Sequence, residues 1–215
     1  MIRSDNTGCD VLLRALGGPS IVMAHLQQLG VSGLRVDRTE IAIAMDSLKA
    51  ARPSALVRAD RASPEQLEDS LTPAEQALMV HSYEDDPRDT GTPHALVELL
   101  SRFQLEDRLS RVSAALLRSL MQRARPVQLA LKLPPNTPSL HKTGTGWGSA
   151  NDIGIVTLPN GQHLMLAILV SHAQNLSLEA ADALIADAGR AVYDRVSGEL
   201  ERSTGVSPSL RAGHF

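Results

Sequence analysis

The chain has 215 residues, of which 43% are hydrophobic and 21% charged, an ordinary composition for a globular protein of one or two domains. A net charge of −3 and an aromatic fraction of 2% argue against a nucleic-acid partner. No apolar run reaches the roughly 18 residues of a membrane span, so we expect no membrane partner. Seven scattered histidines and the single Cys9 predict no metal site, no cofactor and no internal disulfide.

Residues 1–125 are predicted to form a helical region. Ser4 or Asp5 is expected to cap a first helix, which Gly17-Gly18-Pro19 ends, and a second helix is expected from Ser20 to about Leu29. The chain does not begin with the basic segment, apolar segment and cleavage site that make up a signal peptide. No signal peptide is therefore visible, and the chain as given is expected to be cytoplasmic.

The middle of this region alternates apolar and charged residues from Leu34 to Glu40, and no helix is assigned between Glu40 and Pro64. Ser63-Pro64-Glu65-Gln66 and Thr72-Pro73-Ala74-Glu75 each predict a helix start, the second with the pattern of a capping box. Further helices are expected from Pro93 and from Ser110 to Arg123. Apolar stripes predict the buried faces of three helices, at Val11, Leu12, Ala15 and Leu16; at Val112, Leu116, Leu117 and Leu120; and at Leu178, Ala181, Leu184, Ile185, Ala188, Val192 and Val196.

Residues 126–215 are predicted to form an antiparallel sheet followed by a helix. Two β-branched or aliphatic runs, 153–158 and 164–170, flank Asn160-Gly161, the strongest short hairpin signal. Lys142-Thr143-Gly144 precedes them on a first strand, and Ser177 is expected to cap a long C-terminal helix. The sequence therefore predicts an α+β fold, with a helical region 1–125 and a three-strand meander plus C-terminal helix over 126–215.

Three short motifs then carry a resemblance to a known family. Ser4-Asp5-Asn6, Asp37-Arg38-Thr39-Glu40 and Lys142-Thr143-Gly144 resemble, in the right order, signature elements of the class A serine β-lactamases. The surrounding stretches 13–19, 87–93 and 151–156 resemble the same family, and the similarity spans about 1–44 and 85–200. The resemblance implies a β-lactamase-like fold that is incomplete at its N-terminus.

The resemblance also implies a role for each matching residue. Ser4 would relay a proton to the leaving lactam nitrogen, Glu40 would activate the hydrolytic water, and Lys142 would hold the substrate carboxylate. The implied substrate-binding groups are the Asn6 amide, the Thr143 hydroxyl, Gly144 and the Thr145 backbone N–H, which supplies half of an oxyanion hole. The implied structural residues are Asp5, Arg38 and Asp89, of which the last two would close the Ω-loop.

The departures from the family pattern predict an inactive chain. The family's nucleophile lies in a Ser-x-x-Lys motif upstream of Ser-Asp-Asn, and the one such string here, Ser139-Leu140-His141-Lys142, is expected on a strand. Ile41 and Ala44 replace the family's proline and asparagine after the base. Arg38 and Asp89 lie 51 positions apart, where the family has an Ω-loop of about 16 residues. We therefore expect an enlarged Ω-loop, with an insertion at about 45–84.

Two functions follow as alternatives. By resemblance the protein is a β-lactam-hydrolysing serine hydrolase of class A type, a family of the periplasm or of secreted proteins, and this chain is expected to be inactive alone. The alternative is a non-catalytic β-lactamase-like binding or interaction protein. The expected partners are a β-lactam, a missing N-terminal fragment and a second copy, which would associate through the uncharged strand 163–171.

Overall fold

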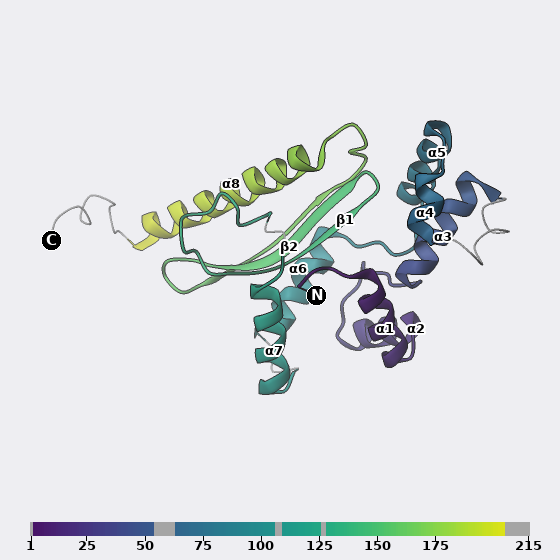
Figure 1. Cartoon of the computed structure of the whole chain (residues 1–215). Coiled ribbons are helices and arrows are strands. Elements are labelled where there is room, and N and C mark those ends of the chain that lie inside the picture. Colours follow the sequence, from purple (N-terminus) through teal and green to yellow (C-terminus); the bar gives the residue numbers. More distant parts are fainter. Residues whose placement is uncertain (1, 54–62, 106–108, 126–127, 205–215) are drawn as a thin grey trace.

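The computed structural model describes residues 2–53, 63–105, 109–125 and 128–204. Figure 1 shows a sheet with helices on both faces and a separate group of helices beside it. The elements in chain order are α1 (Asn6–Leu16), α2 (Pro19–Gln28), α3 (Glu40–Ala51), α4 (Pro64–Asp69), α5 (Pro73–Glu84), α6 (Pro93–Leu105), α7 (Arg111–Gln122), β1 (Ser139–Gly146), β2 (Ser149–Thr157), β3 (His163–Val170) and α8 (Leu178–Thr204).

The sheet is the predicted three-strand antiparallel meander, in the order β1-β2-β3. Ile153 in the central strand lies opposite Lys142 on one side and Ala167 on the other. Gly161 adopts φ 84° in the turn between β2 and β3, a left-handed conformation that glycine reaches without a steric penalty. Because β2 is the central strand, the outer edges of β1 and β3 have no strand partner among the described residues.

Two hydrophobic clusters hold helices against the two faces of this sheet. On one face, Ile185 and Tyr193 of α8 pack onto a cluster that includes Leu166 of β3. α8 packs closely against the segment before β1 at Gly189. A Cβ at this position would lie only 2.4 Å from the Leu129 carbonyl oxygen. On the other face the cluster unites α6, α7 and β2 through Leu100, Met121 and Ile155.

A third cluster lies outside the sheet, where α3, α4 and α5 pack together into what we call the α3–α5 unit. Its buried side chains are Leu48, Ala51, Leu67, Leu71 and Met79. Both predicted helix starts are confirmed, since Ser63 and Thr72 each form a complete capping box with Gln66 and Glu75. The helix α3 was not predicted; Thr39 caps it by accepting from the Ala42 N–H.

The chain enters the α3–α5 unit after Leu34 and leaves it before Gly91. These two segments are hydrogen-bonded to each other, and we call this place the neck. Leu34 and Gly91 form an antiparallel bridge, the Arg35 N–H donates to the Thr90 carbonyl at 2.8 Å, and the Thr92 N–H donates to the Gly33 carbonyl at 2.9 Å. Residues far apart in the sequence are thus side by side at the point where the unit begins and ends.

Several apolar stripes that were predicted to be buried are exposed in the structure. Leu12 of α1 is 64% exposed and Val112 of α7 is 81% exposed. The buried face of α8 agrees with the prediction only in part: Ala181 and Ile185 are buried, whereas Leu184 and Val192 are exposed and Tyr193 is buried instead. Periodicity located these helices, but it did not determine which elements cover their apolar faces.

α1 and α2 meet at a sharp bend. Gly17 and Gly18 both have φ 98°, and the two helices are inclined by 72° to each other. Among the described residues no single helix is long and apolar enough to cross a membrane, and only the bent pair of α1 and α2 has that length and apolar character when the two are taken together.

Candidate active site

A cavity of about 790 Å³ brings the three sequence motifs together. It lies between the start of α1, the start of α3, the α3–α5 unit and the second half of β1. All the predicted site residues line it except Asp5, which instead caps α1 by accepting from the Gly8 N–H. The predicted residues in its wall are Ser4, Asn6, Arg38, Glu40, Asp89, Lys142, Thr143, Gly144 and Thr145.

The contact between Ser4 and Lys142 joins the first motif to the third. The Lys142 ammonium donates to the Ser4 hydroxyl at 2.6 Å and also to the Thr143 carbonyl. Ser4 has φ 52°, an uncommon conformation for a residue with a Cβ, immediately before the cap of α1. With this backbone conformation the Ser4 hydroxyl contacts Lys142 of β1.

Glu40 is the first residue of α3, and this start of the helix lies at the cavity. The carboxylate of Asp10, a buried residue of α1, accepts from the Glu40 N–H at 2.6 Å and from the Ile41 N–H at 3.1 Å. These are two of the donors that the first turn of a helix leaves without a helical partner. Ala44, one turn further along α3, also lines the cavity. Asp10 therefore fixes the position of the predicted base relative to Asn6.

The electrostatics of the cavity favour a proton acceptor at Glu40. Burial, followed by the negative charge of Asp10, raises the pKa of Glu40 above its usual value. Burial lowers the pKa of Lys142, while the nearby Asp152, Cys9 and Glu40 oppose that change. Burial and Glu40 raise the pKa of the Cys9 thiol, which keeps it protonated. A carboxylate with a raised pKa is a better proton acceptor than an ordinary carboxylate, and Glu40 shares the cavity with the hydroxyl–ammonium pair of Ser4 and Lys142.

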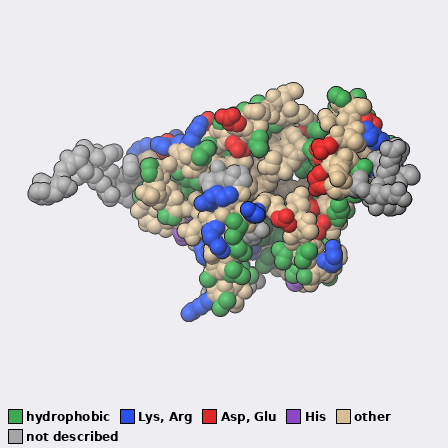
Figure 2. Space-filling model, in the orientation of Figure 1, with side chains coloured by type: hydrophobic (Ala, Val, Ile, Leu, Met, Phe, Trp, Pro, Cys, Tyr) green, Lys and Arg blue, Asp and Glu red, His purple; other side chains and the backbone are tan. Residues whose placement is uncertain are grey.

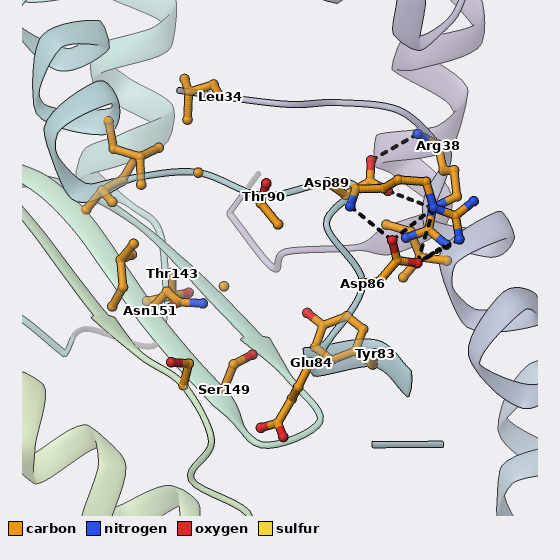
Figure 3. A pocket seen from close by; sticks show the side chains of 18 of the residues that line it. Leu34, Arg38, Tyr83, Glu84, Asp86, Asp89, Thr90, Thr143, Ser149 and Asn151 are labelled. Carbon is orange, nitrogen blue, oxygen red and sulfur yellow. Dashed lines mark hydrogen bonds and ion pairs between the residues drawn. The ribbon is translucent and has the colours of Figure 1, made fainter. Parts of the chain in front are cut away.

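Arg38 and Asp89 meet at the neck of the α3–α5 unit, at one side of the cavity. The Arg38 Nε donates to the Asp89 carboxylate at 2.7 Å, and the Asp37 and Arg38 N–H groups donate to the same carboxylate. Arg38 also pairs with Asp46 and Asp86. Figure 3 shows this network beside a second cavity of about 550 Å³, which Tyr83, Glu84 and Ser149 help to line.

Near the turn that joins β1 to β2, the wall of the larger cavity is formed by contacts of this turn with α4 and α5. The ring of Tyr83 packs edge-on against Trp147, with centroids 5.3 Å apart. The Trp147 indole N–H donates to Glu68 at 2.6 Å. A Cβ on Gly146 would lie 2.6 Å from the Tyr83 hydroxyl, so only glycine allows this approach.

Sequence reasoning missed four residues of this site. Asp10 lies four positions after Asn6, on the same face of the same helix, and that spacing is the signal that could have pointed to it. Tyr83, Trp147 and Glu68 gave no comparable signal. They come together only because the α3–α5 unit folds back onto the β1–β2 turn, a contact between distant segments.

Comparison with known proteins gives one consistent result. A model of the beta-lactamase enzyme family matches residues 1–196. The chain is 27% identical over 214 aligned residues to the extended-spectrum beta-lactamase PER-1 of Pseudomonas aeruginosa, covering 96% of this chain and 56% of that protein. It is 30% identical over 190 residues to a beta-lactamase of Amycolatopsis lactamdurans, covering 87% and 51%. The chain thus spans about half the length of the curated relatives it matches.

Solved structures agree with this comparison. The crystal structure of the TLA-3 extended-spectrum beta-lactamase superposes with a TM-score of 0.63 at 28% identity, covering 90% of this chain and 60% of that one. A reconstructed class A beta-lactamase, the last common ancestor of Gram-negative bacteria, superposes with a TM-score of 0.68 at 30% identity, covering 91% and 62%. The predicted α+β fold is confirmed, and the chain belongs to the beta-lactamase enzyme family, with the fold of its class A members.

Proposed function

We propose that this chain binds β-lactams and carries the substrate-recognition and proton-transfer half of a class A serine hydrolase site. The observation that carries the proposal is the shared cavity, in which the Lys142 ammonium contacts the Ser4 hydroxyl and whose wall also contains Asn6, Glu40 and Thr145. A β-lactam carries a carboxylate and amide carbonyl groups. A lysine ammonium, an asparagine amide and a backbone N–H are suitable hydrogen-bond donors for these groups.

Each group has a role that fits its surroundings. Lys142 attracts the carboxylate of the β-lactam, and its half-buried ammonium interacts more strongly than it would in water. The Asn6 amide and the Thr145 N–H hydrogen-bond the acylamide and the lactam carbonyl. When an added serine bonds to the lactam carbonyl carbon and the C–N bond breaks, Ser4, held by Lys142, relays that serine's proton to the ring nitrogen. Glu40 accepts a proton from the attacking water.

The chain alone is proposed to bind without hydrolysing. Acylation in this family starts from a serine in Ser-x-x-Lys. The string Ser139–Lys142 lies on β1, where the Lys142 ammonium already contacts Ser4. Lys142 therefore cannot activate Ser139 and hold substrate at once. We propose that a nucleophile has to be added to the site by a further segment of polypeptide that carries this motif.

A non-catalytic role as an interaction protein is the second candidate. It is favoured by the α3–α5 unit, which has its own buried cluster and is tied to the rest of the chain at the neck. A unit with its own core can act as a recognition surface without any contribution from the cavity.

Equilibrium binding separates the two candidates. Benzylpenicillin should bind reversibly to the chain, and Lys142→Ala should weaken binding about tenfold or more, equivalent to about 1.4 kcal/mol. Lys132→Ala is the matched control, because the exposed Lys132 pairs with Asp187 on α8. A chromogenic cephalosporin should not be hydrolysed above buffer, and mass spectrometry should find no covalent adduct. Failure of benzylpenicillin to bind would favour the interaction protein.

A further inference from the structure

The larger cavity is lined by charges of both signs. The Lys142 ammonium contacts Ser4 and lies near Glu40, whereas Glu68 of α4 contacts Trp147 just beyond the end of β1, and Glu65 of α4 lines the cavity as well. Arg35, Arg38 and Asp89 also line it, but they are ion-paired at the neck. Within the described part of the chain neither Glu65 nor Glu68 forms a salt bridge. Figure 2 shows acidic side chains on the edge of the α3–α5 unit that faces the sheet. The cavity therefore suits a ligand that is negative at one end and positive at the other.

The separation of Lys142 from the β1–β2 turn matches the length of a β-lactam with its acyl substituent. Gly146 lies four positions after Lys142 on β1, a distance of about 13 Å along an extended strand. A carboxylate at Lys142 therefore leaves the acyl substituent beyond Thr145, against the β1–β2 turn. The side chains that meet it there are Trp147, Tyr83 and Glu68.

The wall at this end is built as a fixed structure. Trp147 packs against the buried cluster of the α3–α5 unit, and its indole N–H holds Glu68 in place. Tyr83 packs edge-on against the same ring, and its hydroxyl lies over Gly146, where a side chain would collide with it. A π-face and a carboxylate placed side by side are complementary to an aromatic group that carries a cationic nitrogen.

We infer that the α3–α5 unit selects the substrate of the cavity, favouring β-lactams whose acyl substituent combines an aromatic ring with a cationic nitrogen. Trp147 and Tyr83 contact the ring, while Glu68 and Glu65 attract the cation. This inference rests on the proposed function, because it takes the carboxylate of the β-lactam to lie at Lys142.

Three penicillins that differ only at the α-carbon of the side chain test the inference. Benzylpenicillin is neutral there, ampicillin carries an amine and carbenicillin a carboxylate. At about pH 6 the ampicillin amine is protonated. Ampicillin should bind about threefold more tightly than benzylpenicillin, and carbenicillin about threefold more weakly, as expected for partly exposed charges. The differences should shrink in high salt.

The double variant Glu65→Gln/Glu68→Gln removes both charges, and a glutamine at position 68 can still accept from the Trp147 indole. In this variant the three penicillins should bind with affinities within about twofold of one another. Asp69→Asn is the matched control, since Asp69 is exposed on the same helix and does not line the cavity. It should preserve the wild-type order.

Two outcomes would overturn the inference in distinguishable ways. Equal binding of all three penicillins to the wild-type chain, lost in Lys142→Ala, would leave the proposed function intact and refute selection by the α3–α5 unit. No binding of any penicillin would contradict both proposals. An unchanged order in the double variant would show that the preference arises elsewhere in the cavity.

Discussion

Asp10 of α1 and Glu40 of α3 are joined by a 2.6 Å hydrogen bond from the Glu40 N–H to the Asp10 carboxylate. The same carboxylate accepts from Ile41, so one buried side chain holds the start of α3 against α1. Its negative charge also contributes to the raised pKa of Glu40.

Substituting Asp10 should therefore change both the stability of the protein and the titration of Glu40. Asp10→Asn should lower the pKa of Glu40, because a negative charge beside its carboxylate is removed. Asp10→Ala should lower the free energy of unfolding by about 2–3 kcal/mol, since two helix N–H groups lose their acceptor. NMR titration of labelled glutamate and denaturant unfolding measure the two effects. A Glu40 pKa that rises in Asp10→Asn would contradict this account.

The neck should be sensitive to loss of Asp89. This side chain accepts from two backbone N–H groups and from the Arg38 guanidinium, and both members of the ion pair are mostly buried. Asp89→Ala should lower the free energy of unfolding by about 2–4 kcal/mol and expose the α3–α5 unit to proteolysis. Asp85→Ala, at an exposed position nearby, should change it by less than about 0.5 kcal/mol. Equal effects of the two substitutions would argue against a closing role for Asp89.

The α3–α5 unit should lose stability in acid. Hydrogen bonding to Arg52, then to Thr72, lowers the pKa of Glu75 from its usual 4.5 to about 2. A carboxyl group with a lowered pKa stabilises the fold above its unfolded pKa, and this contribution disappears as the pH falls through about 2. The wild-type protein should therefore have a higher melting temperature than the Glu75→Gln variant at neutral pH. This difference in melting temperature should vanish near pH 2. Thermal melts followed by circular dichroism test this; a difference independent of pH would refute it.

The outer edge of β3 should promote self-association. The run from Leu164 to Val170 contains no charge, proline or glycine, and in the described structure only β2 pairs with it. Sedimentation velocity should show oligomers that grow with concentration. Hydrogen exchange of the β3 amides should slow as they form. A compact monomer at high concentration would contradict the prediction. Leu166→Lys is unsuitable as a probe, because Leu166 is buried against the cluster under α8.

Local sequence signals predicted most of the secondary structure. The capping residues Ser63 and Thr72 and the Asn160-Gly161 turn act within a few residues, so their patterns indicate structure directly. α3 was missed because the alternation before Glu40 masked its Thr39 cap. The exposed faces of α1, α7 and α8 could not be predicted, since burial depends on which distant segment covers a helix. The same limit hid the contact of Trp147 with Glu68.

The neck at Leu34 and Gly91 makes the segment between them a module whose length can vary. Because its two ends are already hydrogen-bonded to each other, adding or removing residues inside it changes the closure entropy only slowly. A relative could therefore gain or lose α4 and α5 without altering the sheet. Glu40 lies near the start of this module. Tyr83 and Asp89, which form part of the cavity wall, lie near its end. Changes in length between them can reshape the entrance of the cavity while Asp10 keeps the base in place.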